Sequence, residues 1–141
     1  MEGTLRRLIE VYWRELALYR EVREHVARQR ELIEAGCGYS EINAELSHKR
    51  ELLMAIEELE ASIRGERELW RRHRHRLDSG LATTLMGLLA EVTALVESIL
   101  AEERQNEILL TSRRRHGLQA PVDARRAAAS YRSHSRGEER R

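Results

Sequence analysis

Two histidines lie among arginines in the run Trp70-Arg71-Arg72-His73-Arg74-His75-Arg76, and this composition raises the question of a metal or phosphate site. Side chains at positions i and i+2 of a helix point in different directions, so His73 and His75 would diverge. No carboxylate or thiol stands at the i+4 positions that could complete a metal shell. We therefore interpret the run as the basic end of a helix, where positive charge complements the helix dipole.

The other reactive side chains give no better indication of catalysis. Cys37 has no His or Asp near it in the sequence to activate a thiolate, and a lone cysteine cannot form an internal disulfide. The many carboxylates are expected on exposed helix faces. The chain contains no glycine-rich phosphate loop, no zinc-type spacing and no nucleophile elbow. The sequence predicts a protein that is not an enzyme and that uses no cofactor, metal or small-molecule substrate.

The composition favours helices. The chain has 141 residues, of which 35% are charged, with eight Gly, one Pro and no Phe. This leaves little turn chemistry for a β fold, and Ala, Leu, Glu and Arg are good helix formers. Residues 1–112 carry 16 basic and 21 acidic side chains, whereas residues 113–141 carry nine Arg against three acids. The sequence thus predicts an all-α body of net charge −5 and a flexible, basic C-terminal tail of net charge +6.

Apolar residues at alternating three- and four-residue steps predict three helices, over about residues 4–35, 41–76 and 80–112. The predicted seams are Leu5, Ile9, Tyr12, Leu16, Tyr19, Val22, Val26 and Ile33; then Ile42, Leu46, Leu53, Ile56, Leu59, Ile63 and Trp70; then Leu81, Leu85, Leu88, Val92, Leu95 and Ile99. Short breaks between helices imply antiparallel neighbours. The expected fold is an elongated antiparallel three-helix bundle, with a coiled-coil hairpin followed by a third long helix.

Helix ends are predicted from their capping residues. Gly36 suits the C′ position after the first helix, and Ser40 suits the N-cap of the second. Gly65 is expected to weaken or bend the last third of the second helix. Either Asp78 or Ser79 is expected to cap the third helix.

Two polar residues interrupt the apolar seams. Lys49 occupies a seam position of the second helix, and Asn106 occupies one of the third. If the hairpin turns near residues 76–80, the two residues meet in one layer. A polar layer of this kind costs stability but fixes the register of the helices.

The most apolar stretch, Leu81 to Ala101, is long enough to raise the question of a membrane span. Glu91, Glu97 and three threonines argue against one. The segment Met1–Arg7 lacks the apolar run of a secretory signal, and we expect a cytoplasmic protein without a membrane span.

Two segments resemble the FlgN-like flagellar export chaperones. The stretch Ser47-His48-Lys49-Arg50-Glu51-Leu52-Leu53-Met54-Ala55-Ile56-Glu57-Glu58-Leu59-Glu60 is similar to the second helix of that family, in which a Lys precedes a Leu pair, an apolar residue and Leu-Glu. The stretch Glu102-Glu103-Arg104-Gln105-Asn106-Glu107-Ile108-Leu109-Leu110 resembles the end of its last long helix. The resemblance covers about residues 4–112.

The resemblance implies a cytoplasmic chaperone for hook–filament junction proteins, which keeps them unassembled and delivers them to the flagellar type III export apparatus. Amphipathic terminal helices of such clients would bind an apolar groove. We expect that groove on the third helix, along the flanking stripe Met86, Leu89, Val96 and Leu100. The same stripe could instead be buried against the first two helices or in a homodimer. In the family, a mobile C-terminal segment docks to the export apparatus, and Tyr131 is the candidate anchor here.

Two other functions stay open. The first is a self-associating coiled-coil adaptor or structural protein without chaperone activity. The second is nucleic-acid binding by the basic tail, which could neutralise several phosphates but offers Tyr131 alone for base stacking.

Overall fold

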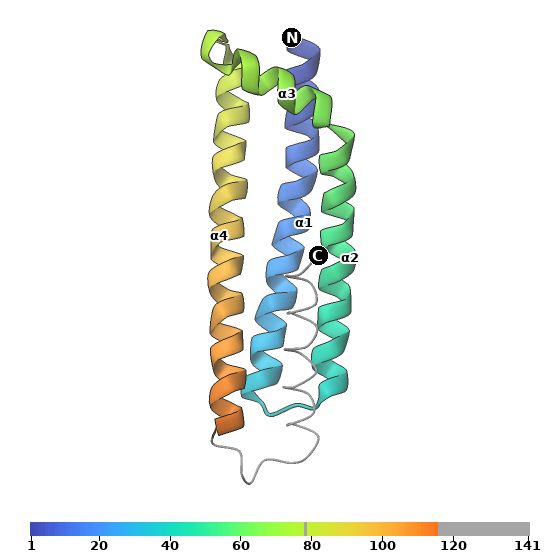
Figure 1. Ribbon diagram of the computed structural model, residues 1–141, viewed down its shortest axis with the longest axis vertical. Helices are drawn as coiled ribbons and strands as arrows, with labels where there is room; N and C mark the ends of the chain where they lie inside the picture. The colour runs from blue at the N-terminus through green and yellow to red at the C-terminus, as the bar shows by residue number, and fades with distance from the viewer. Residues whose placement is uncertain (78, 116–141) are drawn as a thin grey trace. The chain divides into compact units, whose positions relative to one another are not determined.

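The computed structural model describes residues 1–77 and 79–115. Within these ranges the chain is all-helical and contains no strand. The elements are α1 (Glu2–Glu34), α2 (Tyr39–Ser62), α3 (Arg64–His73), the short 3-10 helix η1 (Arg74–Arg76) and α4 (Gly80–Arg115) (Figure 1). The prediction of an all-α protein is confirmed for this part of the chain.

The predicted second helix is in fact two helices, which meet at Ile63. Ile63 leaves helical geometry with φ −117° and ψ 19°, and its N–H donates to Glu60 O three residues back at 3.3 Å. The Ser62 hydroxyl donates to Leu59 O at 2.6 Å, a local bond that competes with the helical ladder. Gly65 follows two residues later and lowers helix propensity further. The expected bend is thus a break, after which α3 runs across from the end of α2 toward the start of α4 (Figure 1).

The turn after α1 is the predicted glycine cap. Gly36 has a φ of +74°, its N–H donates to Ile33 O at 3.2 Å, and the N–H of Cys37 donates to Leu32 O at 3.0 Å. These two bonds form a Schellman motif, which satisfies carbonyl groups at the end of a helix. Arg113 supplies further donors, to Ile33 O and Cys37 O at 3.3 Å each.

The other predicted ends differ in detail. α2 begins at Tyr39, so Ser40 lies inside the helix and is not its N-cap. The hydroxyl of Ser79 accepts a bond from the N–H of Ala82 at 3.2 Å, which makes Ser79 the cap of α4. Asp78 lies outside the described residues. α4 continues to Arg115, so the first three residues of the predicted tail are helical.

The chain divides into two compact units, which are described separately. Unit 1 comprises Met1–Val22 and Glu51–Ser98. Unit 2 comprises Arg23–Arg50 and the segment that begins at Ile99, described here as far as residue 115. α1, α2 and α4 each contribute residues to both units.

Unit 1 contains the larger apolar core. Its buried cluster draws on α1, α3, α4 and the break residue: Leu5, Leu8, Val11, Tyr12, Leu16, Ile63, Trp70, Ala82, Leu85, Leu88 and Val92. The seam prediction missed Leu8 and Val11, which are fully buried. α1 therefore buries a wider face here than a two-position seam provides, because both α3 and α4 pack against it.

Unit 2 has a small apolar cluster and several buried polar side chains. The cluster is Ile33, Ile42, Leu46 and Leu110. Gln29, Lys49 and Asn106 are buried in the same unit, with exposed fractions of 0%, 5% and 0%. The two units thus differ in what they bury: unit 1 buries mainly apolar side chains, and unit 2 buries a larger share of polar ones.

Candidate partner-binding site

The described part of unit 1 contains a half-open pocket beside α3, with a volume of about 360 Å³. Apolar side chains from three helices form part of its wall: Leu8, Tyr12, Trp70 and Leu89. The rest is charged, and comes from α3 and η1: Arg64, Arg67, Glu68, Arg71 and Arg74. The break at Ile63 creates this arrangement, since it lets α3 turn away from the direction of α2 and cross the end of unit 1.

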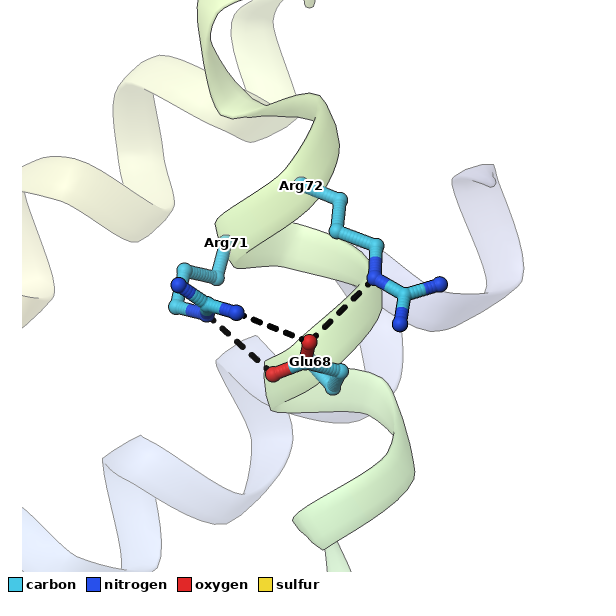
Figure 2. A network of polar contacts seen from close by, with 3 residues as sticks. All are labelled: Glu68, Arg71 and Arg72. Atoms are coloured by element: carbon cyan, nitrogen blue, oxygen red, sulfur yellow. Dashed lines mark hydrogen bonds and ion pairs between the residues drawn. The ribbon is translucent and has the colours of Figure 1, made fainter.

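Carboxylates hold two of these arginines in place. Arg67 Nη1 donates to Glu60 Oε2 at 2.6 Å. Arg71 binds Glu68 through two bonds of 2.9 and 3.2 Å, and Arg72 adds a third at 3.2 Å (Figure 2). The bond from Arg71 holds the pKa of Glu68 below its ordinary value. These pairs are exposed, so they contribute little to stability, but they fix where the guanidinium groups lie.

A buried carboxyl group lies in the same unit. Glu15 is 1% exposed, and its Oε1 atom has no hydrogen-bond partner among the described residues. Burial, followed by the hydrogen bond and the negative charge of Glu60, raises the pKa of Glu15 to about 8, and Arg67 opposes this shift. The shift favours the protonated, neutral form of Glu15 near neutral pH. The expectation that all carboxylates lie on exposed faces is wrong at this position.

Two tyrosines respond to the same environment. Burial, helped by the charge of Glu60, raises the pKa of Tyr12 to about 12. The pKa of Tyr19 is also raised, by burial and then by Glu15 and Glu60. The sequence did contain a signal for Glu15, because it stands three residues after Tyr12 and four before Tyr19, on the face that both tyrosines bury.

The predicted binding stripe on α4 is only partly exposed. In unit 1, the side chain of Met86 is 51% exposed, whereas Leu89 and Val96 are half-buried against the core. Leu100 belongs to unit 2 and is 50% exposed. The stripe is thus neither fully buried nor a continuous row of free side chains. Leu89 also lines the pocket beside α3.

α4 is apolar enough to raise the membrane question again. The stretch Gly80–Arg113 could cross a membrane by its length and composition, and 17% of its most apolar window is buried. Glu91 and Glu97 are both exposed on this helix. The absence of a membrane span stays a prediction.

The structure gives the two predicted polar-layer residues different partners within unit 2. Lys49 Nζ donates to Glu103 Oε1 at 2.8 Å, and Asn106 Nδ2 donates to the Val26 carbonyl oxygen of α1 at 3.0 Å. Gln29, whose amide has no partner among the described residues, is a third buried polar side chain. Sequence reasoning passed over Gln29, although the seven-residue gap between Val26 and Ile33 marks its seam position.

The histidines of the basic run and Tyr131 are the remaining residues that the sequence singled out. His73 closes α3 and His75 lies in η1. Among residues 1–77 and 79–115, no group of three or more His, Cys, Asp or Glu side chains could hold a metal ion. Tyr131 lies outside the described residues.

No protein-family model, no curated protein and no solved structure matches this chain. The resemblance to flagellar export chaperones therefore depends on its two sequence motifs alone.

Proposed function

We propose that this protein is a cytoplasmic export chaperone of the flagellar type, which binds an amphipathic terminal helix of a hook–filament junction protein along α4. The observation that carries the proposal is the exposure of two large apolar side chains on this helix, Met86 and Leu100, at 51% and 50%. A solvent-facing helix surface normally carries polar residues at such positions. An amphipathic partner helix would cover them and remove apolar surface from water.

We propose that the body of this chaperone is an antiparallel three-helix bundle, which is followed by a flexible basic tail. Clients that polymerise through terminal helices need a partner that offers one long apolar strip and no deep cavity. Small-angle X-ray scattering of the full chain, alone and with a client, tests this arrangement.

The direct experiment is complex formation with purified hook–filament junction proteins, followed by light scattering for the mass. We expect a 1:1 complex, which the double variant Met86→Glu plus Leu100→Glu weakens at least tenfold. These positions are preferable to Val96, because Val96 packs against the core and its substitution would also disturb folding. Met54→Glu is the matched control, since Met54 is 62% exposed and lies on α2. Failure to bind any junction protein, or equal binding by the double variant, contradicts the proposal.

The same exposed side chains favour a second candidate, a self-associating adaptor without chaperone activity. In that case a second copy of the chain covers Met86 and Leu100, and the mass of the free protein rises with concentration above the 16.5 kDa of the monomer. The double variant would then be monomeric. A mass that stays at the monomer value over a hundredfold range of concentration excludes this candidate.

A further inference from the structure

The arginine-rich pocket beside α3 is not needed by a purely apolar groove on α4. We propose that this pocket binds an acidic peptide segment that carries one bulky apolar side chain. The inference goes beyond the proposed function, because it assigns a second binding site. Binding there depends only on the acidic and apolar side chains of the peptide segment, whichever protein contains that segment.

Charge supports an acidic occupant. Residues 64–76 contain six arginines and two glutamates, which gives this short segment a net charge of +4 in a body whose net charge is −5. The side chains of Arg64 and Arg74, which line the pocket, form no hydrogen bond or ion pair with another described residue. Arg67 and Arg71 are already oriented by carboxylates, so little side-chain entropy is lost when they meet a ligand.

The apolar wall determines what kind of anion fits. The volume of about 360 Å³ lies at the small end of the range for ligand pockets, about 300–1,000 Å³. Half-buried Leu89 and the small exposed parts of Tyr12 and Trp70 give the pocket an apolar wall, behind which Leu8 is fully buried, and a phosphate or a bare carboxylate leaves that wall unused. A peptide segment can fill that surface with one side chain while its own carboxylates reach the arginines at the rim.

Nucleic acid and membranes fit the pocket less well. Single-stranded nucleic acid binds through exposed aromatic faces, but Tyr12 and Trp70 are only 7% and 9% exposed. A membrane-surface helix presents a row of apolar side chains outward, whereas Leu69 is the one large apolar side chain that α3 exposes. Both alternatives enter the test as competing ligands.

The test uses the fluorescence of Trp70 in the full chain. A Trp13→Phe background removes the other tryptophan, which is 52% exposed and absent from the pocket lining. The probe is a short synthetic peptide with glutamates around a single leucine. We expect saturable binding that weakens with salt and is lost when the leucine becomes alanine. We also expect its loss when the glutamates become glutamines.

Variants locate the site. Arg64→Glu plus Arg74→Glu should weaken the peptide by about tenfold for each arginine, the usual effect of a charge-assisted hydrogen bond. Arg20→Glu plus Arg28→Glu makes the same change of charge at exposed α1 positions outside the pocket and should leave affinity within about twofold. Circular dichroism checks folding, and Arg64→Gln plus Arg74→Gln replaces the charge-reversal pair if that pair unfolds.

Three results would overturn the inference: equal affinity for the glutamine peptide, equal affinity of the pocket and control variants, or stronger pocket-dependent binding of a single-stranded oligonucleotide or of anionic vesicles. None of these changes touches Met86 or Leu100. A failed peptide experiment therefore leaves the proposed function standing, and the reverse also holds.

Discussion

Unit 1 and unit 2 share three helices but bury different kinds of side chain. Unit 1 contains a broad apolar cluster and, among its described residues, a single buried acid, Glu15. The described part of unit 2, which ends at residue 115, contains four clustered apolar residues together with the buried Gln29, Lys49 and Asn106. Apolar burial is strong but carries no direction, whereas a buried amide or amine is tolerated only in the register that gives it a partner. The comparison suggests that unit 1 supplies most of the stability and that unit 2 determines how the helices align.

The largest expected effect comes from the core of unit 1. Leu85→Ala removes a fully buried side chain and should lower the free energy of unfolding by about 2–5 kcal/mol, because the cavity closes only in part. Urea denaturation measures this change. Met86→Ala, at the neighbouring exposed position, should change the free energy by less than about 0.5 kcal/mol. Similar losses at both positions would contradict the difference in burial between these two side chains of unit 1.

The next effect tests the ion pair of unit 2. Glu103→Ala leaves the Lys49 ammonium buried without its carboxylate, and should cost about 2 kcal/mol, less than for a fully buried pair because the Glu103 side chain is 29% exposed. Adding Lys49→Met should restore most of the loss, since it removes the unpaired charge. Glu107→Ala, on an exposed position of the same helix, is the control for helix propensity. If the double variant is no more stable than Glu103→Ala, the loss does not come from an unpaired buried charge at Lys49.

The buried Glu15 of unit 1 gives a pH-dependent effect that is smaller for each unit of pH. The folded-state pKa of Glu15 is about 8, above its ordinary value of 4.5, so the folded chain binds a proton that the unfolded chain releases between these values. Stability should therefore fall as pH rises through this window, by about 1 kcal/mol per pH unit. Glu15→Gln should flatten that slope and raise the melting temperature most at pH 8. A melting temperature whose pH dependence is the same in both proteins would contradict the assignment.

The smallest effect compares two glycines. Gly36→Ala places a side chain at a φ of +74° and should cost about 1 kcal/mol. Gly65→Ala meets no atom within 4 Å and should add about 0.5 kcal/mol, because alanine favours the helix. Chemical denaturation should show that the free energy of unfolding falls in Gly36→Ala and rises in Gly65→Ala. A stabilising Gly36→Ala would exclude the Schellman turn.

The sequence predicted the helical class and the two turns from local signals. Gly36 and Ser79 cap the helices that they were expected to cap, because capping depends on the nearest few residues. The sequence predicted a weakening or bend near Gly65, but not the break at Ile63 that separates α2 from α3. The apolar period continues through it, and the local signals, Ser62 and Gly65, are each weak.

The candidate site depended more on tertiary structure. Glu15 stands on the face of α1 that Tyr12 and Tyr19 bury, but its depth of burial depends on its neighbours, which include Glu60 of α2 and Arg67 of α3. Arg64 and Arg74 line one pocket with Leu8 and Leu89 only because the chain turns at Ile63. In α4, periodicity selected Met86 and Leu89 equally. Their different exposure depends on which neighbours lie beside each, and no single-helix pattern contains that information.

Lys49 has a practical consequence. It is the chain's only lysine, and its amine is buried and bonded to Glu103. An amine-acylating reagent can therefore reach this side chain only when its surroundings open. The rate of acylation at Lys49, followed by mass spectrometry, therefore measures how often unit 2 opens locally. The measurement needs no engineered label.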